Sequence, residues 1–154
     1  MPITPVEFRQ TLGHWPSGVT VVTMQDGDDV HGITVSAFSS LSLEPPLVGV
    51  AIARKARSHG MLDRLPRYAV SILRDDQRDL SEHFAGRPVA LEEHPFETFD
   101  ELPVIRGAIA QIVCSVTDRL EVGDHTIYVG RIDASRLGEG APLAYHKGAY
   151  RHLG

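Results

Sequence analysis

Two long β-rich segments, 108–122 and 125–137, are separated only by Gly123-Asp124. A two-residue Gly-Asp connection between β-rich runs is a strong hairpin signal. Antiparallel strands of this length outweigh the short helices expected elsewhere in the chain. The hairpin therefore predicts a fold dominated by antiparallel strands.

The rest of the chain supplies further short strands. Segment 17–25 (SGVTVVTMQ) is β-branched and is followed by the turn signal 26–29 (DGDD), after which 31–36 returns as a second strand. Segment 47–53 (LVGVAIA) is apolar on both faces and reads as a central strand. Further strands are expected over 68–73 (YAVSIL) and, briefly, over Tyr150-Arg151.

Three short helices are expected between these strands. The first is capped by Thr4, has Pro5 in its first turn and Glu7 completing a capping box, and runs to about Gly13. The others cover 58–65, stopped by Pro66, and 76–85, ended by Gly86. Segment 87–107 shows no clear pattern and reads as a long excursion. Strands and helices do not alternate, which favours a mainly β, closed or nearly closed barrel with helical decoration, in one domain over residues 1–154.

Composition excludes several classes of protein. The 154 residues carry a net charge of −5, which argues against nucleic acid as the main partner. No apolar run approaches the roughly 20 residues of a membrane span, and the N-terminus lacks the signal-peptide pattern. The single cysteine, Cys114, fits a reducing cytoplasm, so a cytoplasmic protein without membrane contact is expected.

The familiar catalytic motifs are absent. No G-x-G-x-x-G follows a strand, and there is no Walker loop, no G-x-S-x-G and no H-E-x-x-H. The eight histidines show no metal-ligand spacing, so no metal site is predicted. Cys114 lies in an apolar strand, where a buried structural thiol is the favoured interpretation.

Five hydroxyl side chains lie between Thr34 and Ser42, with no charged residue from Gly32 to Leu43. Hydroxyls and backbone amides offer many short donors without net charge, which suits a large flat ligand with a polar edge. The alternative is that these residues only satisfy strand ends and turns. Taken alone, the stretch slightly favours that alternative.

A basic turn shifts the balance. Strand 47–53 ends in Arg54-Lys55-Ala56-Arg57-Ser58, directly before a predicted helix, and it is the densest basic cluster of an acidic chain. Cations beside a helix start favour an anion such as phosphate, although a solvated basic turn is common. Together the two features indicate a phosphate-bearing ligand with a flat polar head.

Three further features are weak singly. They are Phe84-Ala85-Gly86 at a helix end, Gly123-Asp124-His125 at a tight turn, and Tyr145 to Tyr150, where two aromatics frame a basic turn. Each has an ordinary explanation as a core phenylalanine, a solvated histidine or a surface turn.

In this order, the features resemble the short-chain flavin reductase family, the reductase partners of two-component flavin monooxygenases. The resemblance spans nearly the whole chain. It is carried by Phe8-Arg9, 16–23 (PSGVTVVT), 31–38 (HGITVSAF), 40–42 (SLS) with 45–47 (PPL), 68–73, 84–86 (FAG) and 123–130 (GDHTIYVG).

The resemblance implies an FMN-binding split β-barrel of Greek-key type, usually a homodimer with the flavin near the subunit interface. It implies that Thr34, Val35, Ser36 and Ala37 meet the isoalloxazine, with Ser40 nearby. The turn from Ala53 through Arg54 and Lys55 to Arg57 would hold the ribityl chain and phosphate. The remaining implied contacts are Phe84, Ala85 and Gly86 along the flavin, His125 facing the nicotinamide, and Tyr150 closing the site.

Many family members carry an asparagine at the position of Ala53 and small hydroxyls at those of Lys55 and Arg57. The extra charge here suits either the flavin phosphate or a second anionic group, such as the second phosphate of FAD or the pyrophosphate of NADH.

The implied activity is an NAD(P)H-dependent reduction of FMN or FAD, with NADH or NADPH as cosubstrate and a flavin-dependent monooxygenase receiving the reduced flavin. Hydride passes directly between two stacked rings, so the protein needs no nucleophile, and His125 serves to position. The alternatives are a flavin-binding redox protein, sensor or carrier without free-flavin reductase activity, an enzyme with tightly held flavin acting on another substrate, and an interaction module without cofactor.

Overall fold

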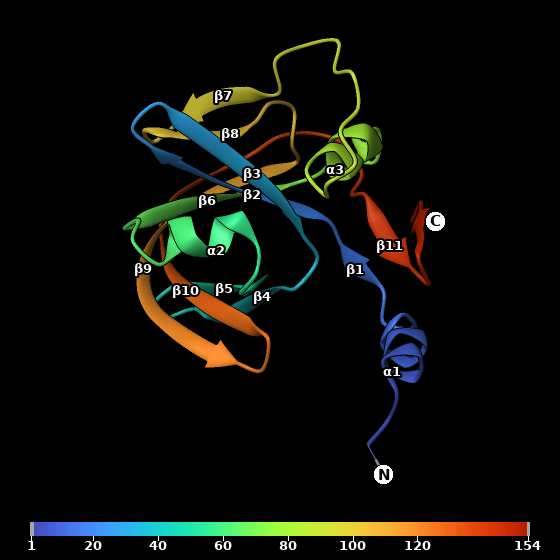
Figure 1. The fold of residues 1–154 in the computed structure, drawn as a ribbon. Coiled ribbons are helices and arrows are strands. Elements are labelled where there is room, and N and C mark those ends of the chain that lie inside the picture. The colour runs from blue at the N-terminus through green and yellow to red at the C-terminus, as the bar shows by residue number, and fades with distance from the viewer. Residues whose placement is uncertain (1, 154) are drawn as a thin grey trace.

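The computed structural model describes residues 2–153, and the predicted long hairpin is its largest feature (Figure 1). The hairpin lies within a seven-stranded antiparallel sheet in the order β3-β2-β6-β9-β10-β5-β4. The strands are β2 (Thr20–Asp26), β3 (Asp29–Val35), β4 (Phe38–Ser42), β5 (Leu47–Ala53), β6 (Arg67–Ile72), β9 (Ala110–Val122) and β10 (His125–Leu137).

The two edges of this sheet are consecutive in the chain. Strand β3 forms one edge and β4 the other, yet only Ser36 and Ala37 separate them. The sheet must therefore curl until its edges approach each other. Past this crossing, the amide of Ala51 donates to the carbonyl of Ala37 at 3.1 Å, which fixes the crossing against β5. Strands β3 and β4 are not paired, so the barrel is split, as expected for the fold class.

The pairing of the two longest strands, β9 and β10, is irregular at two points. The pairing of β9 and β10 shifts register between Val129 and Gly130 and again between Ile132 and Ala134. Gly130 permits close approach, because a Cβ there would lie 2.6 Å from the Cβ of Cys114 and 2.7 Å from the hydroxyl of Tyr68. The Tyr68 hydroxyl donates to the carbonyl of Tyr128 at 2.9 Å inside the core. Burial raises the pKa of the Cys114 thiol to about 12, in line with a structural role.

The remaining elements decorate the barrel. The helices are α1 (Pro5–Leu12), α2 (Arg57–Leu62) and α3 (Arg78–His83), and the short strands are β1 (Ser17–Gly18), β7 (Phe96–Phe99), β8 (Leu102–Ile105), β11 (Ala144–His146) and β12 (Ala149–Arg151). A second cluster of buried side chains, including Val21, Leu73 and Leu143, lies beside Leu80 and Phe84 and carries α3. Figure 1 shows α3 beside β11, while α1 projects below β1. None of the helices in residues 2–153 is long and apolar enough to cross a membrane.

Several predicted boundaries are corrected. The first helix ends at Leu12, and the Thr4 cap is confirmed by a 3.1 Å bond from the amide of Glu7 to the Thr4 hydroxyl. Helices α2 and α3 have six residues each and are shorter than predicted. The prediction missed β4 within the hydroxyl-rich stretch, β11 before the C-terminal turn, and the β7-β8 hairpin inside segment 87–107.

Candidate functional site

A pocket of about 220 Å³ forms where β3, α3 and the C-terminal strands meet. We call it the tyrosine pocket, and it is lined by Val19, Thr34, Ser36, Ser81, Ala85, Arg87, Tyr145 and Tyr150. An adjoining cavity of about 310 Å³ shares Val19 and Ser36 with it and adds Trp15 and Phe38. The two cavities therefore adjoin at Val19 and Ser36, and each has two aromatic residues in its lining.

Hydrogen bonds tie the three walls of the tyrosine pocket together. The Thr34 hydroxyl donates to the carbonyl of Ser81 at 2.6 Å, and the Thr34 amide donates to the carbonyl of Phe84 at 3.0 Å. The hydroxyls of Ser81 and Tyr150 lie 2.7 Å apart, which joins α3 to β12. Because the Thr34 proton is already used, its oxygen can only accept from a ligand, whereas the exposed Ser36 can donate.

The aromatic wall is ordered and faces cations. The rings of Tyr145 and Tyr150 meet edge to face, with centroids 5.2 Å apart. The guanidinium of Arg78 lies over the Tyr150 ring, 4.9 Å from its centroid. Arg87 donates to a Glu82 carboxylate oxygen at 2.8 Å, yet its side chain is 74% exposed. The pocket is therefore neutral and hydroxyl-rich inside and cationic at its rim.

Only part of the hydroxyl-rich stretch reaches this pocket. Thr34 and Ser36 line it, whereas Val35 is buried in the main core and offers only backbone groups. Ala37 is exposed at the crossing between the sheet edges. Ser40 lies on β4 and lines a different groove, which it shares with Leu41 and Leu43.

The segment Phe84-Ala85-Gly86 is divided between the core and the site. The Phe84 ring packs in the second core cluster, with its centroid 5.6 Å from that of Phe96, and a Cβ at Gly32 would lie 3.0 Å from its edge. Ala85 lines the tyrosine pocket. Gly86 adopts φ +84°, which turns the chain after α3 and sets the position of Arg87.

The basic turn is joined to the tip of the long hairpin. His125 is in register with Ala53, and the Arg54 amide donates to the carbonyl of Asp124 at 3.0 Å. The Arg54 guanidinium donates to the carbonyl of Gly123. These contacts bring the predicted phosphate turn and His125 together at one end of β5.

The cations of this turn differ in availability. Arg57 is ion-paired with Asp29, whereas Lys55 is exposed and has no hydrogen bond or ion pair with residues 2–153. The Ser58 hydroxyl at the start of α2 is buried without a hydrogen-bond partner among the same residues. The Nδ1 atom of His125 lies 2.8 Å from a carboxylate oxygen of Asp124, and this hydrogen bond lowers the pKa of Asp124.

The predicted residues therefore form two groups. Thr34, Ser36, Ala85 and Tyr150 line the tyrosine pocket, while Ala53, Arg54, Lys55 and His125 gather at the hairpin tip. His125 does not line the tyrosine pocket. Ala37 connects the groups, since its carbonyl accepts from Ala51, two residues before Ala53.

Sequence reasoning missed four residues of the tyrosine pocket, namely Val19, Ser81, Arg87 and Tyr145. Arg87 directly follows the predicted Gly86, and Tyr145 begins the predicted C-terminal turn, so both lay next to recognised signals. Ser81 gave no signal, because a serine in a short polar helix is ordinary.

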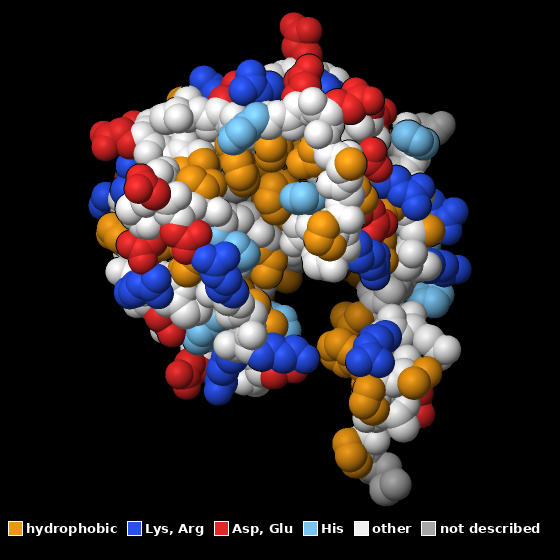
Figure 2. Space-filling view, turned by 45° about the horizontal axis from the view of Figure 1, so that its top comes forward, with side chains coloured by type: hydrophobic (Ala, Val, Ile, Leu, Met, Phe, Trp, Pro, Cys, Tyr) orange, Lys and Arg blue, Asp and Glu red, His pale blue; other side chains and the backbone are white. Residues whose placement is uncertain are grey.

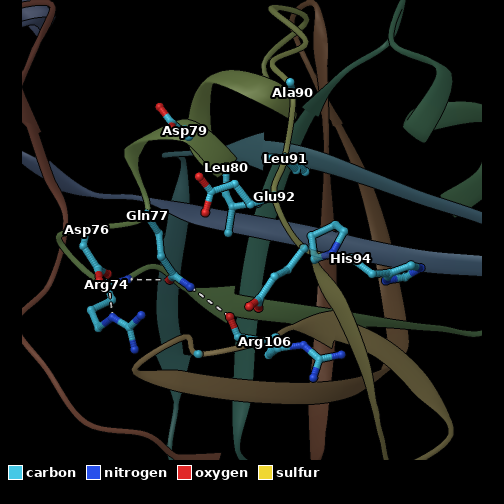
Figure 3. A pocket seen from close by; sticks show the side chains of 13 residues that line it. Arg74, Asp76, Gln77, Asp79, Leu80, Ala90, Leu91, Glu92, His94 and Arg106 are labelled. Atoms are coloured by element: carbon cyan, nitrogen blue, oxygen red, sulfur yellow. Dashed lines mark hydrogen bonds and ion pairs between the residues drawn. The ribbon is translucent and has the colours of Figure 1, made fainter.

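A larger cavity lies elsewhere. It has a volume of about 620 Å³ and lies between α3 and segment 90–95, and Figure 3 shows its lining. Gln77 spans its floor: its side-chain oxygen accepts from the amide of Arg74 and its nitrogen donates to the carbonyl of Arg106, both at 2.9 Å. Arg74 is ion-paired with Asp76. These polar groups serve internal contacts, and none of the predicted site residues lines this cavity.

Comparison with known proteins assigns the family. The profile of the family described as flavin reductase like domain matches residues 12–154. An NADH-dependent flavin reductase from Rhodococcus sp. is 38% identical, covering 98% of this chain and 88% of its own. The reductase component of a 4-hydroxyphenylacetate 3-monooxygenase from Thermus thermophilus is 41% identical, covering 95% of both.

The fold agrees with the sequence comparison. The solved structure of the flavin reductase PheA2 in its native state superimposes with a TM-score of 0.95 at 39% identity, covering 99% of each chain. The tyrosine pocket, the split barrel and the matching profile point to one conclusion: this chain belongs to the flavin reductase-like domain family.

Proposed function

We propose that the protein is an NAD(P)H-dependent flavin reductase acting on FMN or FAD. In the reaction, NAD(P)H, a proton and the flavin yield NAD(P)⁺ and reduced flavin, which a partner monooxygenase consumes. The observation that carries the proposal is the gathering of Thr34, Ser36, Ala85 and Tyr150 on one pocket in a chain of this family. The Rhodococcus relative is named for NADH-dependent flavin reduction and the Thermus relative as a monooxygenase reductase component.

The residues of the pocket fit a flat, polar-edged ring. Its lining offers the hydroxyls of Thr34, Ser36 and Ser81 and two tyrosine rings, and Arg87 is its one charged residue. Two adjoining cavities that share Ser36 provide room for two rings. When bound, the flavin would accept the hydride at its isoalloxazine ring. Neutral donors stabilise negative charge at the ring edge without holding the product in a full ion pair.

The remaining contacts follow the two groups of residues. The isoalloxazine lies against Thr34 to Ala37 and is closed in by Tyr150, with the segment 84–86 nearby. The ribityl chain and phosphate run past Ala37 toward the turn 53–57. Lys55 and Arg54 are better placed to hold phosphate than Arg57, because Arg57 is already paired with Asp29.

His125 positions the nicotinamide in this proposal. Its Nδ1 faces Asp124, which leaves Nε2 free to bind a carboxamide. We expect His125→Ala to lower NAD(P)H-dependent turnover more than flavin affinity. Unchanged steady-state kinetics in this variant would remove His125 from the mechanism.

The proposal includes a homodimer in which a second copy covers α1. This helix has eight residues and none is buried, while Val6, Phe8 and Leu12 are more than half exposed. Figure 2 shows hydrophobic side chains along this projecting N-terminal segment. A helix this short is not stable without packing partners. Light scattering on wild type and Phe8→Ser tests the point: a monomeric wild type would contradict it.

The deciding assay follows absorbance at 340 nm in mixtures of purified protein, NADH or NADPH, and excess FMN or FAD. Loss of absorbance with any pair supports the proposal. Flavin binding without oxidation of either nicotinamide would identify a carrier or sensor instead. A protein that binds no flavin would be an interaction module.

A further inference from the structure

We propose that Arg87 and Arg78 bind the diphosphate of the nicotinamide dinucleotide at the rim of the tyrosine pocket. This inference rests on the proposed function, because it names where the second substrate of that reaction is held. The proposal places the phosphate of the flavin at the basic turn and the diphosphate of the dinucleotide at α3. The two phosphate-bearing parts of the ligands, their anionic tails, therefore lie at opposite ends of the site.

The reaction itself creates the need for a second cationic place. Two phosphorylated ligands must be bound together while their rings stack, so two anionic tails leave one small site. Like charges repel, and a single cationic cluster would bring the tails together. At the basic turn, Arg54 and Lys55 have no carboxylate partner among residues 2–153, and they suffice for one phosphate.

The α3 rim has the groups that a diphosphate requires. Arg87 lines the tyrosine pocket and keeps a 74% exposed side chain, although Glu82 orients its guanidinium from one side. Arg78 has no carboxylate partner among residues 2–153 and lies over the ring of Tyr150, which is itself part of the pocket wall. Guanidinium groups bind phosphate oxygens through paired, charge-assisted hydrogen bonds.

The arrangement is also fixed enough to be selective. The Ser81–Tyr150 hydrogen bond holds the ring under Arg78, and Gly86 at φ +84° directs the chain to Arg87. One arginine therefore lies over the Tyr150 ring, and the other lines the pocket that this ring borders. A dinucleotide whose nicotinamide enters beside Tyr150 would bring its diphosphate to this rim.

The test compares Arg87→Ala with Arg87→Lys and with a matched control, Arg64→Ala. Arg64 is likewise an exposed arginine paired with a carboxylate, Asp26 at 2.7 Å, and it lines no part of the pocket. Hydride donors are NADH and the uncharged 1-benzyl-1,4-dihydronicotinamide, with FMN as acceptor. We expect Arg87→Ala to lower the ratio of kcat/KM for NADH to that for the uncharged donor about tenfold, Arg87→Lys to restore part of it, and Arg64→Ala to leave it unchanged.

A binding measurement separates this inference from the proposed function. ADP-ribose carries the diphosphate without nicotinamide, and calorimetric titration should show it binding about tenfold more weakly to Arg87→Ala than to wild type. If Arg87→Ala is active but has an unchanged ratio of kcat/KM values and an unchanged affinity for ADP-ribose, the assignment is overturned. It is also overturned if the substitution raises the KM for FMN and leaves the KM for NADH unchanged. A wild type that oxidises neither donor would instead refute the proposed function.

Discussion

The hydrogen bond between the hydroxyls of Ser81 and Tyr150 offers a quantitative test of how the tyrosine pocket is held together. The two oxygens are 2.7 Å apart, and Ser81 is only 1% exposed. In Tyr150→Phe, the buried Ser81 hydroxyl loses this hydrogen-bond partner. Leaving a buried hydroxyl unsatisfied costs roughly 1–3 kcal/mol, so we expect about 2 kcal/mol of lost stability.

The reverse change is expected to cost less. In Ser81→Ala the Tyr150 hydroxyl remains, but it borders the pocket and can bind water, so the loss is about 1 kcal/mol. In the double variant no buried hydroxyl is stranded, and the loss should again be about 1 kcal/mol. The double variant should thus be about 2 kcal/mol more stable than the sum of the single effects predicts.

Urea unfolding of the four proteins measures this coupling, and titration with FMN measures the effect on the pocket. Tyr145→Phe is the matched control, because the Tyr145 hydroxyl has no hydrogen bond with residues 2–153, and its stability should stay within about 0.5 kcal/mol of wild type. Single effects that add within about 0.5 kcal/mol would refute the reasoning, because they would mean that the bond does not join α3 to β12.

Two further predictions concern stability. Gly130→Ala should destabilise the fold by about 1–3 kcal/mol in urea unfolding, because its Cβ would lie 2.7 Å from the Tyr68 hydroxyl. The control is Gly60→Ala, which lies in open space on α2 and should be neutral or stabilising. Equal effects of the two substitutions on stability would contradict the packing argument. Burial, followed by the charge of Arg57, lowers the pKa of His31, so the unfolded chain binds its proton first as pH falls. Stability should therefore decline as pH drops below about 6.5, less steeply in His31→Gln than in wild type; parallel pH profiles would exclude His31 as a cause.

The sequence predicted the large elements because their signals are local. The hairpin around Gly123-Asp124 and strand 47–53 match β9, β10 and β5 closely, since β-branched periodicity and a two-residue turn specify both. The β7-β8 hairpin escaped because its turn places Asp100 and Glu101, rather than glycine, at positive φ. Strand β4 escaped because its serines resemble a loop, although pairing with β5 makes it a strand.

The site was predictable only in part, for a different reason. Thr34 and Ser36 lie in a recognisable motif, but their partner Ser81 is distant in sequence and becomes part of the pocket only when α3 packs against β3. The same holds for Arg57, whose ion pair with Asp29 forms between segments that no sequence pattern connects. The local sequence identified the cluster of cations, but the tertiary fold determines which of them remain available for a ligand.

The two-residue connection Ser36-Ala37 joins the unpaired edge strands β3 and β4. Ser36 also lines both cavities. A ring bound there would touch the one stretch of chain that holds β3 and β4 in proximity without any ladder between them. A bound ligand would then stabilise the two edge strands relative to each other, at the place where no hydrogen bonds between β3 and β4 do so. In a closed barrel of the same strands, β3 and β4 would be hydrogen-bonded to each other, and a ligand could not stabilise the fold in this way.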